Sequence, residues 1–145
     1  MKTIGEILQA KAKDIWVISP EVKVFEALKL MADKGVGALL VVDKGQVVGI
    51  LSERDYARKV ILKGESSKNI PVRAIMTSKV YGVIPETKTE ERMALMTDKH
   101  IRHLPVYEGD RLIGLVSIGD IVKSIISEQK VMIEHLTNFI MGKYM

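Results

Sequence analysis

The sequence contains no cysteine. This absence excludes disulfide bonds, thiolate nucleophiles and thiolate metal sites. Long hydrophobic runs are also missing, since the longest apolar stretch is Val36 to Val42 and a membrane-spanning helix needs roughly 20 residues. The start, Met1 to Ala10, alternates polar with apolar groups and lacks the continuous apolar core of a secretion signal. We therefore expect a cytoplasmic protein that makes no contact with a membrane.

Blocks of charge of one sign are absent as well. The 22 lysines and arginines are interleaved with 18 aspartates and glutamates, which leaves a net charge of +4. Nucleic-acid binding needs a basic patch, and no such patch is visible in the sequence, so a nucleic-acid partner is not expected. The 145 residues fit one compact domain or two small units that share a core.

What the sequence does contain is an internal repeat. The dipeptide Pro20-Glu21 recurs as Pro85-Glu86, an offset of 65 residues, and the two copies align without a gap from Pro20 to about Ile61. The residues that match at this offset are Leu39 with Leu104, Val41 with Val106, Gly49 with Gly114, Ser52 with Ser117 and Asp55 with Asp120. An internal repeat reports architecture before local propensity does. We therefore expect two copies of one small unit that face each other, with the function between them.

Hydrophobic periodicity predicts the order strand, helix, strand, strand, helix in each copy. In the first copy these elements are a strand over 15–18, a helix that ends at a left-handed Gly35 cap, strands over 38–42 and 47–51 joined by a tight turn, and a helix over 55–63. In the second copy they are a strand near 80–84, a helix to about Lys99 that opens with a capping box at Thr87–Glu90, a hairpin that turns at Glu108–Asp110, and a helix from Asp120.

The predicted domain organisation follows from these elements. We expect an N-terminal helix in 1–13, the first repeat in 14–63, a linker with a lead-in helix in 64–78, the second repeat in 79–127 and a C-terminal helical extension in 128–145. The extension carries an apolar stripe, and the N-terminal helix is amphipathic. Both could pack on their own core or on a second chain.

Two Ser-x-x-Asp motifs follow apolar strands at matching positions, Ser52 to Asp55 and Ser117 to Asp120. One interpretation is a capping box, in which the serine hydroxyl and the carboxylate satisfy free amides of the first helical turn. The other is a nucleotide site, in which each aspartate accepts hydrogen bonds from two ribose hydroxyls while amides and a nearby arginine hold phosphate. Carboxylates turned onto their own amides, or side chains filling the space between the copies, would argue against the ribose assignment.

Catalytic and metal sites find little support in the sequence. His100-x-x-His103 lacks the further ligands that a zinc site needs, and no metal is expected. Neither Ser52 nor Ser117 has an evident histidine base, so we expect no enzymatic activity.

The paired motifs resemble a tandem pair of CBS (cystathionine β-synthase type) domains, also called a Bateman module. The segments that carry the resemblance are Leu39–Asp43 with Val48–Asp55, Arg102–Val106 with Ile113–Asp120, and the lead-in Val72–Thr77. The resemblance covers almost the whole chain. It implies an α/β fold of the α+β type, with two pseudo-twofold-related β-α-β-β-α repeats packed sheet to sheet and extra helices at both ends.

The resemblance also implies two clefts between the copies that take an adenosyl ligand. By position, one site comprises Ser117, Ile118 and Asp120 with Val17, Val36 and Gly37, and the other comprises Ser52, Arg54 and Asp55 with Val80, Ile101 and Arg102. Ala38 and His103 adjoin these sets. Because Arg54 is matched by Gly119, and Gly37-Ala38 by Arg102-His103, we expect the two sites to differ in affinity.

The function that follows is a non-catalytic regulatory module. It would bind AMP, ATP or NAD, with S-adenosylmethionine less favoured, and would transmit occupancy through the shape of a homodimer or the binding of a downstream protein whose identity is unknown. The alternative is a dimeric adaptor that keeps the fold and reads no nucleotide.

Overall fold

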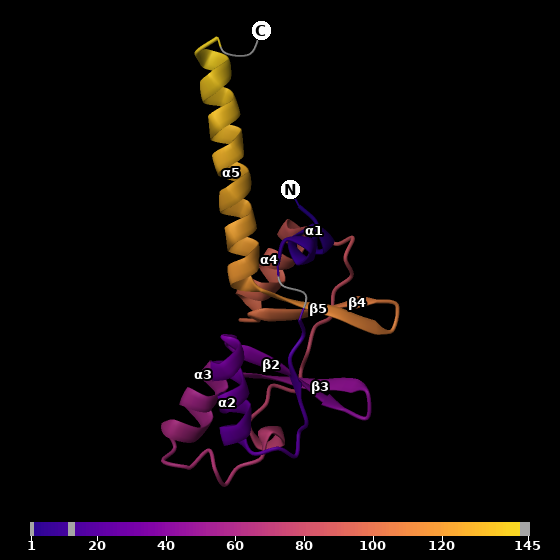
Figure 1. Ribbon diagram of the computed structural model, residues 1–145, viewed down its shortest axis with the longest axis vertical. Helices are drawn as coiled ribbons and strands as arrows, with labels where there is room; N and C mark the ends of the chain where they lie inside the picture. The colour runs from indigo at the N-terminus through magenta and orange to yellow at the C-terminus, as the bar shows by residue number, and fades with distance from the viewer. Residues whose placement is uncertain (1, 12–13, 143–145) are drawn as a thin grey trace. The chain divides into compact units, whose positions relative to one another are not determined.

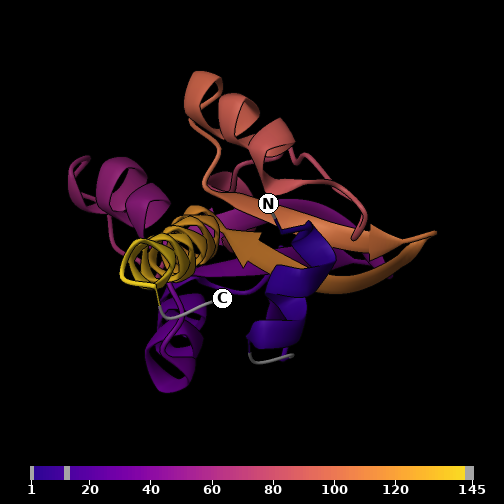
Figure 2. The same ribbon diagram turned by 90° about the horizontal axis from the view of Figure 1, so that it is seen from above.

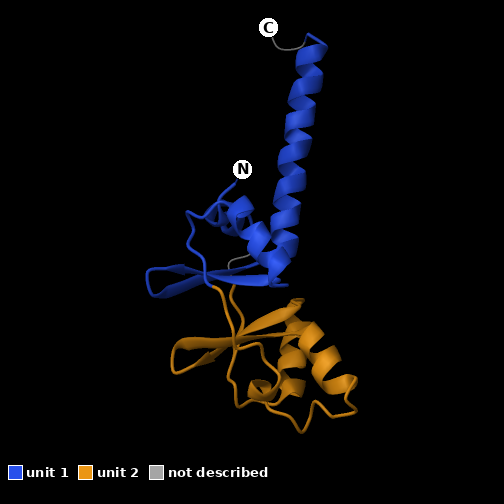
Figure 3. Ribbon diagram, turned by 180° about the vertical axis from the view of Figure 1, so that it is seen from behind, with its two compact units in different colours: residues 1–13, 82–145 blue, residues 14–81 orange. Residues whose placement is uncertain are grey.

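The computed structural model describes residues 2–11 and 14–142, which form two compact units. Unit 2 comprises Asp14–Tyr81, and unit 1 comprises Met1–Lys13 together with Gly82–Met145 (Figure 3). Each unit combines helices with a small sheet, so the predicted fold class is confirmed.

Unit 2 is built on a three-stranded sheet of order β1-β2-β3, of which β2 and β3 are labelled in Figure 1. Its elements are β1 (Val17–Ile18), α2 (Val24–Lys34), β2 (Ala38–Asp43), β3 (Gln46–Ser52), α3 (Glu53–Tyr56), a π-helical turn (Ala57–Ile61) and a 3-10 turn (Val72–Ala74). Strand β1 is parallel to β2, and β2 is antiparallel to β3. The buried core of the unit consists of Val24, Ala27, Met31, Leu39, Val41, Leu51, Val60, Val72 and Ile75.

The turns of unit 2 form where the sequence predicts them. Gly35 closes α2 with φ 66° and ψ 35°, the left-handed conformation that glycine adopts without steric cost. Lys44 and Gly45 both have positive φ, 51° and 78°, as a tight two-residue hairpin requires. The final helix of the copy is shorter than predicted as a regular α-helix, because it changes to π-helical turns at Ala57.

Unit 1 repeats this plan around a two-stranded sheet. Its elements are α1 (Ile4–Ala10), α4 (Thr89–Asp98), β4 (His103–Glu108), β5 (Arg111–Ser117) and α5 (Ile118–Ile140). Helix α5 has 23 residues and is nearly end-on in Figure 2. The predicted boundary between the second repeat and the C-terminal extension, near residue 127, therefore lies inside one uninterrupted helix.

The predicted strand near 80–84 is wrong, since only Val83 pairs, as a single parallel bridge to Val106. This bridge has the register of Ile18 with Val41 in the first copy. Gly82 stands where the first copy has Val17, and glycine contributes no side chain to strand packing.

The predicted capping box at Thr87–Glu90 is also wrong. Lys88 is the N-cap of α4, and its side chain makes no capping hydrogen bond. The backbone of this segment pairs instead with the N-terminus, where Ile4 N donates to Thr87 O (2.8 Å) and Thr89 N donates to Lys2 O (3.2 Å). This pairing holds Lys88 extended and delays the start of the helix.

Two segments, α1 in unit 1 and the lead-in at 72–77 in unit 2, each pack on the β-hairpin of their own unit. In unit 1, Leu8 of α1 lies against Gly114 of β5, where a Cβ would come within 2.6 Å of Leu8 Cδ2. In unit 2, a Cβ on Gly49 of β3 would lie 2.8 Å from Met76 Sδ and 2.9 Å from Thr77 O. Glycine is required most strictly at Gly49, where the neighbouring atoms include the backbone oxygen of Thr77, whereas at Gly114 they belong to the flexible side chain of Leu8. As a result, residues 1–13 belong with the second repeat, and the lead-in at 72–77 belongs with the first.

Candidate functional site

The first corner is the strand-to-helix turn at Ser52, where β3 ends and α3 begins. Ser52 is the N-cap: Asp55 N donates to Ser52 Oγ (3.2 Å), and Ser52 N donates to Asp55 Oδ2 (3.0 Å). The other carboxylate oxygen, Oδ1, lies 3.2 Å from Lys59 Nζ and accepts a 3.4 Å hydrogen bond from Thr77 Oγ1. The Asp55 side chain is only 13% exposed, so both of its oxygens are held within unit 2.

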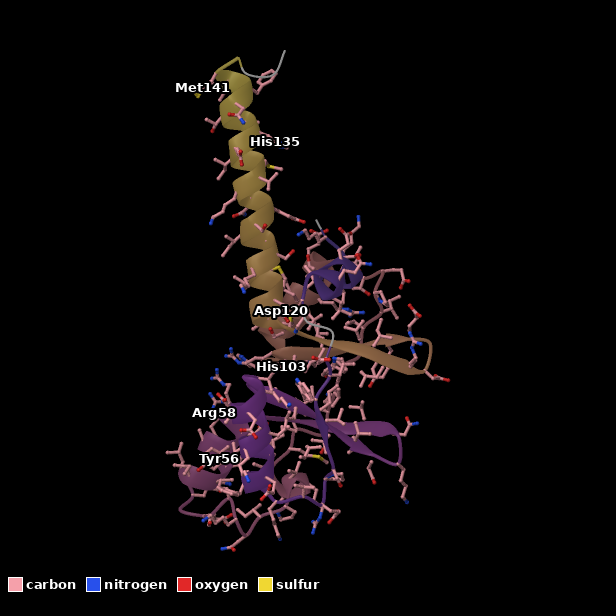
Figure 4. The ribbon with its side chains drawn as sticks, viewed as in Figure 1. Tyr56, Arg58, His103, Asp120, His135 and Met141 are labelled. Carbon is pink, nitrogen blue, oxygen red and sulfur yellow. The ribbon has the colours of Figure 1, made fainter. Side chains whose placement is uncertain are left out.

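The second corner is the equivalent turn at Ser117, where β5 ends and α5 begins. Asp120 N donates to Ser117 Oγ (3.1 Å), and Ser117 N donates to Asp120 Oδ2 (2.8 Å). Lys11 Nζ donates to the same Oδ2 (2.7 Å) and to Leu115 O (2.9 Å). The contacts that Ser117 N and Lys11 Nζ make with the carboxylate both use Oδ2, and the Asp120 side chain is 22% exposed. Figure 4 shows Asp120 at the base of α5.

Charge and burial act in opposite directions on Asp120. Burial alone would raise its pKa, but hydrogen bonds from Lys11 and Ser117, together with the charge of Lys11, outweigh burial and lower the pKa below its usual value. The carboxylate is therefore ionised at neutral pH, as an acceptor for hydroxyl groups must be.

Backbone hydrogen bonds bring the start of each central strand to its corner. Glu53 N donates to Gly37 O (3.1 Å), and Ala38 pairs with Ser52. The second copy repeats both contacts, from Ile118 N to Arg102 O (2.9 Å) and from His103 to Ser117. The structure therefore gathers two of the predicted groups, which are Gly37, Ala38, Ser52 and Asp55 in unit 2, and Arg102, His103, Ser117, Ile118 and Asp120 in unit 1.

The other predicted residues occupy the edges of the same units. Val36 and Ile101 are equivalent, since their amides donate to Met31 O and Met96 O at the ends of α2 and α4. Val17 is an exposed residue of β1, and Arg54 is an exposed residue of α3. Val80 lies in the segment without regular secondary structure that precedes Val83. The predicted sites combine residues from both units, and these combinations remain predictions.

The capping interpretation of both motifs is confirmed. Each carboxylate accepts a hydrogen bond from its own serine amide, which is the arrangement that argues against the ribose assignment. The argument is stronger for Asp55, whose two oxygens both have protein partners, than for Asp120, whose capping and ion-pair contacts go through Oδ2 alone.

Sequence reasoning missed three residues that contact these aspartates. Lys59 lies four residues after Asp55 on the same helical segment, a spacing that is itself a signal for an ion pair. Thr77 and Lys11 reach their aspartates through the packing of the lead-in segments, and no local pattern marks them.

Within residues 2–11 and 14–142, no group of three or more metal-ligating side chains is found. Over the same residues, no helix is long and apolar enough to cross a membrane.

Comparisons with known proteins agree on one family. The family model "CBS domain" matches residues 4–62 and again residues 72–127. A curated relative, the mitochondrial CBS domain-containing protein CBSX3 of Arabidopsis thaliana, is 41% identical over 152 residues, covering 98% of this chain and 73% of that protein.

Solved structures share the fold. A CBS-domain protein of Burkholderia ambifaria MC40-6, named for signal transduction, is 53% identical with a TM-score of 0.84, covering 88% of this chain and 96% of that one. The CBS domain pair of protein MJ0100, solved with 5'-methylthioadenosine and S-adenosyl-L-methionine, has a TM-score of 0.73 at 22% identity and covers 86% of this chain and 99% of that one.

Proposed function

Since the chain belongs to the CBS domain family, whose domain pairs are regulatory modules, we propose that it is a non-catalytic sensor of an adenosyl compound. AMP, ATP and NAD are favoured over S-adenosylmethionine, because all four carry the ribose diol that the aspartates would read but only these three carry phosphate for the arginines near the predicted sites. Ligand occupancy would be transmitted through the shape of a homodimer or through the affinity for a downstream protein.

The observation that carries the proposal is the ionised carboxylate of Asp120 at the start of a long helix. Asp120 is partly exposed and has its pKa lowered. An ionised carboxylate has about four acceptor positions on two oxygens, and the capping box and Lys11 use only Oδ2. Oδ1 would therefore accept a ribose hydroxyl while the cap stays intact. The complex of the protein MJ0100 supports an adenosyl ligand at the level of the fold.

The Asp55 corner fits a ligand less readily. Both oxygens of Asp55 already have protein partners, so ligand hydroxyl groups would have to replace Lys59 or Thr77. Arg54 and Arg58 lie beside this corner, and guanidinium groups bind phosphate bidentately. We therefore expect the site that contains Asp120 to bind the nucleoside more tightly.

Isothermal titration with AMP, ATP, NAD and S-adenosylmethionine tests the proposal, with GMP as a control for the base. We expect saturable heat with at least one adenosyl compound. Asp120→Asn keeps an oxygen for the cap but removes the charge, and it should weaken binding by on the order of tenfold or more. Asp110→Asn makes the same change in the hairpin turn of unit 1 and should leave binding unchanged. No saturable heat for any of the four adenosyl compounds would refute the proposal.

A second function, a nucleotide-independent adaptor, is favoured by the two capping boxes. A carboxylate whose hydrogen bonds are made within its own unit needs no ligand. If Asp55→Asn and Asp120→Asn both leave every titration unchanged while a partner protein binds without nucleotide, the adaptor is the correct function.

A further inference from the structure

Helix α5 carries an apolar stripe that its own unit leaves uncovered. Near the start of the helix Ile121 is buried, and there α5 contacts β5 and α1. Beyond these first turns α5 extends away from the rest of unit 1 (Figures 1 and 3), with Met141 at its far end (Figure 4). The exposed fraction is 44% at Val122, near the start of the stripe, and 82% at Ile140, at its end.

The stripe has a strict seven-residue period. Val122, Ile125 and Ile126 are followed seven residues later by Gln129, Met132 and Ile133, and after seven more by Leu136, Phe139 and Ile140. These are the a, d and e positions of a heptad, the pattern of a helix that packs against another helix. A repeat of this kind over about five turns, or roughly 27 Å of helix, specifies a long helical partner rather than a local contact.

We propose that this stripe is covered by α5 of a second copy of the chain, with the two helices parallel. Self-association is the simplest cover, because a twofold axis places each a and d residue opposite its own counterpart. A long exposed apolar surface of this kind marks an interaction site. The inference goes beyond the proposed nucleotide site and does not depend on it.

Charges on the edges of the stripe favour the parallel arrangement. The edge beside Ile126 and Ile133 carries Lys123 and Lys130, and the opposite edge carries Glu128. In a parallel pair the basic edge of one helix faces the acidic edge of its partner, whereas in an antiparallel pair like edges face each other.

Gln129 also favours a parallel pair of α5 helices. It is the only polar residue among the nine stripe positions. In a parallel pair two Gln129 side chains would meet and hydrogen bond, and a single polar a position fixes register in this way. In an antiparallel pair an a position faces a d position of its partner, and each Gln129 amide would be left against apolar groups.

Sedimentation equilibrium without nucleotide tests the proposal. We expect the natural chain to be a dimer. Met132→Glu with Leu136→Glu should raise the dimer Kd by on the order of a hundredfold, because the charges would be buried at the contact. The matched control, Ser127→Glu with Val131→Glu, adds the same charge to the same helix outside the stripe and should leave the Kd unchanged. Circular dichroism and the Trp16 fluorescence of unit 2 check that each variant is folded.

The direction of the pair can be tested separately because the chain has no cysteine. Under mild oxidation Leu136→Cys should form a disulfide-linked dimer, since a parallel pair brings the two copies of this position together. Ser127→Cys, on the outer face, should not. A dimer in which Leu136→Cys fails to cross-link overturns the parallel arrangement. A monomeric chain, including one that sediments with lipid vesicles through α5, or a dimer insensitive to the two stripe glutamates, overturns the whole proposal.

Discussion

The corners at Asp55 and Asp120 share the same capping box but obtain their cation from different places. Asp55 pairs with Lys59, four residues further along its own helical segment, whereas Asp120 pairs with Lys11, which is 109 residues away in sequence. Ile50 O accepts from the backbone amide of Thr77 (2.9 Å), and its counterpart Leu115 O accepts from the Lys11 ammonium (2.9 Å). A repeated motif therefore fixes the cap twice, while the surrounding charge depends on which segment packs against each copy.

The largest expected effect is a loss of stability on replacing Gly49 or Gly114, the glycines in the strands that lead to the two corners. A Cβ on Gly49 would lie 2.9 Å from the backbone oxygen of Thr77 and 2.8 Å from Met76 Sδ, whereas a Cβ on Gly114 would meet only the flexible side chain of Leu8. Gly49→Ala should destabilise the protein by about 2–3 kcal/mol, and Gly114→Ala by about 1 kcal/mol. Urea denaturation followed by Trp16 fluorescence and circular dichroism measures both. Equal losses would show that Leu8 and the Met76–Thr77 segment move aside equally easily for the added methyl group.

An intermediate effect is expected at Asp120 and should depend on pH. Its pKa is lower in the folded than in the unfolded chain, so its contribution is complete above the unfolded value of about 3.9 and is lost as pH falls through the folded value. Asp120→Ala leaves Ser117 as the N-cap but removes the carboxylate half of the capping box and the partner of Lys11, and should cost about 1–2 kcal/mol at pH 7. The difference from the natural chain should shrink below about pH 4.

Thermal unfolding between acid and neutral pH, with Asp110→Ala as a control in the exposed turn, measures this dependence. If the loss from Asp120→Ala is the same at every pH, the ionised state of this carboxylate contributes nothing to stability.

The smallest expected effect is the difference in stability loss between replacing Lys59 and replacing Lys11. Lys59→Met removes a partly exposed i,i+4 ion pair with Asp55 (3.2 Å) and a hydrogen bond to Ile75 O (2.9 Å), and should cost about 0.5 kcal/mol, of which high salt removes only the ion-pair part. Lys11→Met removes the equivalent hydrogen bond to Leu115 O (2.9 Å) and a shorter ion pair with Asp120 (2.7 Å), and should cost up to about 1 kcal/mol. Thermal melts at low and high salt distinguish the two. A larger loss for Lys59→Met would reverse the comparison.

Much of the fold could be predicted because its signals are local. The offset of 65 residues, the Gly35 cap and the tight turn at Lys44-Gly45 follow from residue type and spacing, and all three appear in the structure. The strand near 80–84 could not be predicted correctly, because its pairing is limited by Gly82 and by the partner that Val83 finds. The start of α4 depended on the N-terminus, since Lys2 and Ile4 hold the segment that would have capped it.

By itself the sequence determined the duplication, the two Ser-x-x-Asp caps and the heptad stripe of α5, because each arises from spacing along one chain segment. Only the tertiary structure decided that α1 packs with the second repeat, that Lys11 neutralises Asp120 and that the stripe is left uncovered. The physical reason is that burial and ion pairing depend on which surfaces meet in space. Two segments far apart in sequence carry no periodicity or motif that records their contact.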